Sequence, residues 1–329
     1  MAISIKKSLI SVVSIVAVIL FILSIWWDSM PAAYDVETRI NNVAKSNNQE
    51  VVPGYATTST LIDICQWLLD KPGGFLANDM TPPGILMDNM PSFEYGALEQ
   101  IRDLALVMRL DFSRSQSQST GDKDLEIAQT KLNIAHTSWM LPSAEKEYKD
   151  AINALAKYRD RLVATDQTEA QFYTRADNLS DWLREVEKRL GSISHRLSAS
   201  VGHERYDTNL AGDTTAKQST ETDKEVAVKT GWFEVDNVFY ESRGSTWAIL
   251  HFLKAIEVDF KDVLIKKNAE VSLKQIIRDL EATQQTIWSP VILNGSGFGF
   301  LANHSLVMAN YVSRANAALI DLRRLLEQG

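Results

Sequence analysis

The sequence predicts an all-α protein in which one N-terminal transmembrane helix is followed by an antiparallel helical bundle, arranged in two lobes. Three observations predict this fold class. Leu9–Trp27 is an apolar run without a charged residue. Beyond it, apolar residues recur at spacings of three and four in almost every long segment, and sustained strand-like alternation is missing. The chain has one cysteine, so an intramolecular disulfide is impossible and packing must hold the fold together.

The transmembrane helix is the clearest prediction. About 20 helical residues cross a hydrocarbon core of about 30 Å, and Leu9–Trp27 has that length. Lys6 and Lys7 precede the run, and Asp28 is the first charged residue after it. Positive residues flanking a membrane helix stay in the cytoplasm. We therefore expect a single-pass protein of the inner membrane, with residues 1–8 in the cytoplasm and the remainder in the periplasm.

A cleaved signal peptide is the alternative interpretation of the same segment. Its apolar region normally has about 7–15 residues and precedes a cleavage site of small residues. Here the apolar run is longer, and Pro31 lies inside the segment where that site would be. The pattern therefore favours a retained anchor.

Residues 28–201 predict several helices separated by turn-forming residues. Ser92 and Ser143 stand where N-caps belong, each before an apolar pattern of helical period. The Pro- and Gly-rich residues 72–91 interrupt the helical pattern. The predicted helices cover residues 60–69, 92–112, 125–139 and 148–162.

The strongest helical pattern follows a capping-box signature at Thr168 and Gln171. Apolar residues then alternate at spacings of four and three, which is typical of a coiled-coil-like seam. Antiparallel packing within the chain is the favoured interpretation, and a homodimer is the alternative. The stripe consists of Phe172, Ala176, Leu179, Leu183, Val186, Leu190, Ile193 and Leu197.

A polar, aperiodic segment at residues 202–230 predicts a linker or a long loop. It would divide a first helical lobe, residues 28–201, from a second lobe, residues 231–329. Helices are predicted again at residues 235–266, 271–287 and 301–326. The word GFLAN occurs in both proposed lobes, which leaves open whether they arose by duplication.

Composition excludes several classes of function. The formal net charge of −8 argues against a nucleic-acid partner, which requires a concentrated basic face. The five histidines and one cysteine lack the spacing of a metal site, so we expect neither metal nor cofactor. Cys65 lies in an apolar helical context, which predicts a buried, inert thiol. His251 stands among apolar neighbours and is predicted to be a core residue.

Two weak signals for an enzyme exist. Ser143 to Lys146 and Lys229 to Gly231 match the S-x-x-K and K-T-G motifs, but those motifs need a sheet that this chain does not predict. Glu241 stands among aromatic residues, as the general acid of a cell-wall hydrolase would. Arg243 lies two residues further on, and a structural Glu–Arg pair is the favoured interpretation. A peptidoglycan hydrolase or another envelope enzyme remains the alternative function.

The binding candidates lie in the Pro- and Gly-rich segment, whose composition denies its apolar side chains a regular helix. They are Phe75, Ile85, Leu86 and Met87, which either form a surface for a partner or cap the core. The favoured function is a non-enzymatic interaction or structural module of the envelope. Its expected partners are the membrane, through Leu9–Trp27, and envelope proteins.

Five stretches of the chain share one resemblance. They are residues 72–96, 111–119, 138–148, 239–260 and 292–311. Together they resemble one proteobacterial family, called domain of unknown function 2333. The resemblance implies a membrane-anchored protein of the Gram-negative envelope. It implies no assigned activity, cofactor or catalytic residue.

Overall fold

The computed structural model describes residues 2–114, 121–164, 170–206, 225–289, 291–296 and 299–328. In these ranges the secondary-structure elements are all helical apart from one pair of short antiparallel strands, which confirms the predicted all-α class. The elements in chain order are α1 (Ala2–Trp27), α2 (Val36–Ser46), α3 (Tyr55–Asp70), the 3-10 turn η1 (Gly84–Leu86), α4 (Asn89–Val107), the π-helical turn η2 (Met108–Phe112), α5 (Lys123–Leu132), α6 (Ala144–Val163), α7 (Ala176–Ser198), β1 (His203–Tyr206), β2 (Glu225–Val228), the 3-10 turn η3 (Trp232–Glu234), α8 (Val235–Asp259), α9 (Lys261–Lys266), α10 (Glu270–Ala282) and α11 (His304–Glu327).

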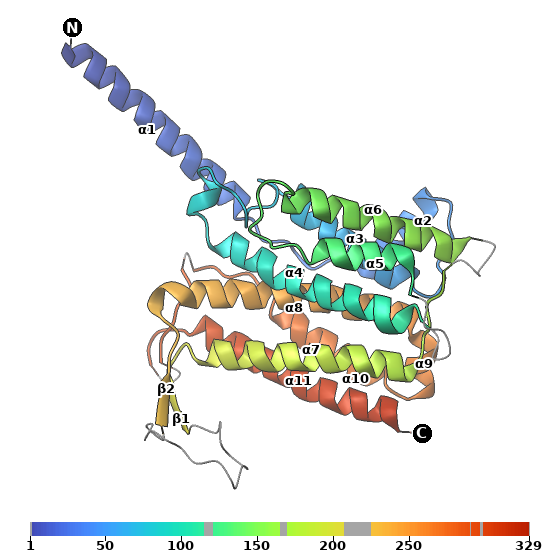
Figure 1. Ribbon diagram of the computed structural model, residues 1–329. Coiled ribbons are helices and arrows are strands. Elements are labelled where there is room, and N and C mark those ends of the chain that lie inside the picture. The colour runs from blue at the N-terminus through green and yellow to red at the C-terminus, as the bar shows by residue number, and fades with distance from the viewer. Residues whose placement is uncertain are drawn as a thin grey trace, which may run out of the picture.

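The first helix, α1, projects away from the bundle (Figure 1). Its segment Leu9–Trp27 is long and apolar enough to cross a membrane, and none of its residues is fully buried, although Trp27 at its end is partly buried against the core. Within the described residues it is the one helix with these properties. A membrane anchor and a signal sequence both fit this finding.

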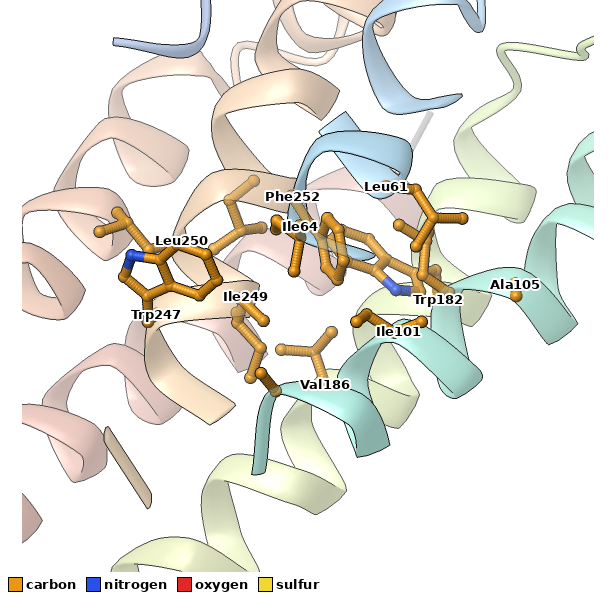
Figure 2. Packing of buried hydrophobic residues seen from close by; sticks show 14 of the residues in the cluster. Leu61, Ile64, Ile101, Ala105, Trp182, Val186, Trp247, Ile249, Leu250 and Phe252 are labelled. Carbon is orange, nitrogen blue, oxygen red and sulfur yellow. The ribbon is translucent and has the colours of Figure 1, made fainter. Parts of the chain in front are cut away.

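The remaining helices form one bundle rather than two lobes with separate cores. Helix α8 packs against α3 and α4, and α7 packs against α11. Figure 2 shows Trp182 of α7, Ile101 of α4 and Trp247 of α8 within the same buried cluster. Residues 28–201 and 231–329 therefore share one hydrophobic core. The segment between them does not divide it; β1 and β2 pair within that segment, and residues 207–224 lie outside the described ranges.

The apolar stripe of α7 packs within the chain. All its positions from Leu179 to Leu197 are buried, and α11 covers them with a second apolar stripe. Ser180 Oγ lies 3.2 Å from Glu327 Oε1, and Ser194 Oγ lies 2.5 Å from Ser313 Oγ. These two pairs show that α7 and α11 run in opposite directions. The predicted capping box is not part of the helix described here: Thr168 lies outside the described residues, and α7 begins at Ala176.

The central pair, α4 and α8, touches backbone to backbone. A Cβ added at Gly96 would lie 1.9 Å from the carbonyl oxygen of Glu241, and one added at Gly244 would lie 2.0 Å from that of Phe93. Ser245 Oγ donates a hydrogen bond of 3.0 Å to the Gly96 carbonyl. Glycine on both helices therefore permits the approach. The two helices begin at the same end of the bundle, so the packing is not antiparallel throughout (Figure 1).

Some predicted helix boundaries were wrong. The helix expected over residues 125–139 ends at Leu132, and Trp139 lies exposed in the following loop. The helix expected over residues 235–266 is interrupted at Phe260, between α8 and α9. Ser143 does cap α6 as predicted, because its side chain accepts a hydrogen bond from the Lys146 N–H.

Candidate functional site

The four binding candidates divide into two groups in the structure. Phe75 is only 3% exposed, and its ring meets that of Tyr148 edge to face at 5.4 Å between centroids. Met87 is half-buried against the core. In contrast, Leu86 is 78% exposed, and Ile85 beside it is also exposed. Phe75 therefore belongs to the core, whereas Ile85 and Leu86 form part of the surface.

A buried ion pair fixes the loop that carries Phe75. Lys71 Nζ lies 2.6 Å from Glu94 Oε1, and both side chains are fully buried. Lys71 also donates to the Gly74 carbonyl. Glu94 accepts hydrogen bonds from the N–H groups of Leu76, at 2.9 Å, and Ala77, at 2.8 Å. Burial raises the pKa of Glu94, and the charge of Lys71 opposes that shift.

The end of α1 packs onto the same loop. Gly73 has a φ of +87°, which favours glycine, and a Cβ there would lie 2.7 Å from Trp27 Cδ2. Asp28 interacts with Asn89, the first residue of α4, and burial raises the pKa of Asp28 to about 6. We call this contact region of Trp27, Asp28, Gly73 and Asn89 the junction.

The residues that follow Asp28 in the chain pack against α8 and form hydrogen bonds with it. Trp247 Nε1 donates to the Ala32 carbonyl at 3.4 Å, and the Tyr34 N–H donates to His251 Nε2 at 3.2 Å. The rings of Tyr34 and His251 stack with centroids 4.1 Å apart. His251 is fully buried, as the sequence predicted. A packed segment thus connects α1 to the bundle.

Exposed apolar side chains gather at the end of the bundle from which α1 emerges. They lie on η1 and the loop before it, the α5–α6 loop, η3, and the α10–α11 loop, all of which lie at that end (Figure 1). Asn78 Nδ2 joins the first two segments by donating to the Ser138 carbonyl at 2.9 Å. We call this set the apolar rim: Met80, Ile85, Leu86, Trp139, Met140, Leu141, Trp232, Phe233, Trp288 and Phe300.

Ile85 and Leu86 are the only rim residues that the sequence predicts as binding candidates. The sequence predicts no binding role for the segments that carry the four aromatic residues outside the α5–α6 loop, and it predicts a helix at Trp139. The available signal was the apolar character of these residues next to turn formers, as in Trp288 before Pro290.

The weak catalytic candidate, Glu241, is held in a structural ion pair. Arg196 of α7 donates to both carboxylate oxygens, from Nη1 to Oε2 at 2.8 Å and from Nη2 to Oε1 at 2.7 Å. The predicted pairing of Glu241 with Arg243 was therefore wrong, because the arginine that pairs with Glu241 is Arg196. Arg243 is buried and donates instead to the Gln284 carbonyl at 3.0 Å. Both oxygens of Glu241 are thus engaged by a neighbouring helix.

Other reactive groups are similarly enclosed. Cys65 is buried, and burial raises the pKa of its thiol to about 12, which makes it unreactive at neutral pH. Among the described residues, no group of three or more His, Cys, Asp or Glu side chains is placed to hold a metal ion.

These features define a class of protein: an all-α bundle carried on one long apolar helix, with a packed junction between the two. The chain belongs to the bacterial family described as "Uncharacterized protein conserved in bacteria (DUF2333)", whose model matches residues 2–329. This confirms the family resemblance read from the sequence. No curated protein and no solved structure matches the chain.

Proposed function

We propose that the protein is a single-pass protein of the inner membrane, anchored by α1 with its N-terminus in the cytoplasm and its bundle in the periplasm. The junction is the observation that supports the assignment of α1 as an anchor. Cleavage after the apolar run would remove Trp27, which packs against Gly73. A signal sequence leaves the mature protein and has no need to contribute to its packing. The contact of Trp27 therefore supports retention of α1.

We further propose that the periplasmic bundle is a non-enzymatic interaction or structural module whose contact surface is the apolar rim. Exposed apolar patches mark interaction sites, and aromatic side chains carry much of the energy of binding. The rim holds three tryptophans and two phenylalanines, listed among its residues above. Glu241, the weak candidate for the general acid of a hydrolase, forms an ion pair with Arg196.

Incubation with purified peptidoglycan sacculi separates this proposal from the hydrolase alternative. We expect the full-length protein to release no more soluble fragments than its Glu241→Gln variant, because neither contains an assembled general acid. Fragment release is measured by chromatography of the supernatant. Release by the wild-type protein that Glu241→Gln abolishes, with thermal unfolding unchanged, would establish the enzyme instead.

A further inference from the structure

We infer that the apolar rim lies in the headgroup region of the bilayer that α1 enters, so that the bundle is held against the membrane by a second contact. This inference rests on the proposed anchor, and it identifies the lipid bilayer as what the apolar rim contacts.

The composition of the rim fits a membrane interface. Outside α1, the large exposed side chains of tryptophan and phenylalanine in the described residues are Trp139, Trp232, Phe233, Trp288 and Phe300. All five lie on segments at the end of the bundle from which α1 emerges (Figure 1). Aromatic residues are enriched at both interfaces of membrane proteins, where an apolar ring meets the polar headgroups.

The junction places this surface at the level where the apolar run ends. Trp27 is the last residue of Leu9–Trp27 and packs on Gly73. Asp28, the first charged residue after the run, interacts with Asn89, three residues beyond Leu86. Because these contacts fix α1 to the residues that flank η1, a bilayer that surrounds α1 lies beside η1, at the end of the bundle that carries the rim. The exposed side chains of η1 therefore continue the apolar surface of α1.

The distribution and charge of the rim favour lipid over a protein partner. Its side chains come from four separate segments at the end of the bundle from which α1 emerges (Figure 1). Acidic side chains lie next to η1: Asp79 lies against Gly84, and Asp88 follows Leu86 by two residues in the sequence. Attraction of this part of the rim to anionic lipid therefore supplies little, and burial of apolar side chains drives its contact. The contact should form on a purely zwitterionic bilayer.

The test measures the depth of an environment-sensitive fluorophore on the full-length protein in phosphatidylcholine vesicles. The buried Cys65 stays unlabelled, so single cysteines can be introduced and labelled with a nitrobenzoxadiazole maleimide. The rim variants are Leu86→Cys and Leu141→Cys. Val271→Cys on α10 is the matched control, because Val271 is 77% exposed and Leu86 is 78% exposed. Ile15→Cys on α1 reports insertion of the anchor. Thermal unfolding of each variant confirms the fold.

We expect doxyl-labelled lipid to quench the labels at Leu86 and Leu141 at least twofold more than the label at Val271, and aqueous iodide to show the reverse order. Quenching by lipid at Ile15 but not at either rim position would overturn the inference and leave the anchor intact. Absence of lipid quenching at Ile15 would overturn the anchor and the inference with it. A third outcome is that neither quencher affects the rim labels until the protein is diluted with more lipid. That result would show that a second copy of the protein covers the rim, and it would also overturn the inference.

Discussion

Gly96→Ala is expected to lower the free energy of unfolding by about 3 kcal/mol or more, at the upper end of the range for overpacked cores. The added methyl group would lie 1.9 Å from the carbonyl oxygen of Glu241, and a backbone atom cannot swing aside as a side chain can. Helices α4 and α8 would have to separate along the centre of the bundle. Gly244→Ala should have a similar effect, because its Cβ would lie 2.0 Å from the Phe93 carbonyl oxygen. Denaturant unfolding followed by circular dichroism measures both.

Gly191→Ala on α7 is the matched control. Its Cβ would lie 3.7 Å from Asn316 Nδ2, an ordinary contact distance. Replacing a glycine inside a helix by alanine usually stabilises it by about 0.5–1 kcal/mol. The control should therefore be as stable as the wild-type protein or more so. Equal stabilities for Gly96→Ala and Gly191→Ala would show that α4 and α8 do not touch as described.

Lys71→Met is expected to cost about 3–5 kcal/mol at pH 7.5, because removal of one partner leaves the other buried without its counter-charge. The partner is Glu94, whose carboxylate would keep only its backbone donors. Lys188→Met is the control. Lys188 and Glu185 form an exposed pair with a spacing of three residues, so its loss should cost less than about 0.5 kcal/mol.

The cost of Lys71→Met should also depend on pH. Burial already raises the pKa of Glu94 above its ordinary value, and loss of Lys71 raises it further. A carboxyl group with a raised pKa in the folded state stabilises the fold below its ordinary pKa, and that stability is lost as the pH rises through the raised value. The difference between variant and wild type should therefore shrink between pH 7.5 and pH 5. An equal difference at both values would contradict the buried pair.

Much of the fold could be predicted because periodic burial leaves a local signal. The apolar stripe of α7 and the apolar run of α1 are examples, since each depends on residues within one helix. The single core was not predicted, because the polarity of residues 202–230 says nothing about which helices meet in space. The contact of α4 with α8 depends on Gly96 and Gly244, and a single glycine in each helix has no periodicity to detect.

The candidate site could be predicted only in part for a similar reason. Proline and glycine marked residues 72–91 as irregular, but irregular backbone can be buried or exposed. Phe75 is buried because Glu94, on another element, holds its loop. Leu86 is exposed because, among the described residues, none covers its side chain, whereas Gly84 in the same turn is buried. Likewise the partner of Glu241 is Arg196, which lies 45 residues away in the sequence.

We propose that α1 is a retained anchor and that the bundle stands in the periplasm. Alkaline phosphatase fused to the C-terminus of the full-length protein tests it most directly, because this enzyme is active only after export. We predict phosphatase activity that sediments with the inner membrane, on a fusion that still contains Leu9–Trp27. An inactive fusion would contradict the topology. An active fusion found in the soluble periplasmic fraction, and lacking that segment, would show that α1 is a signal sequence rather than an anchor.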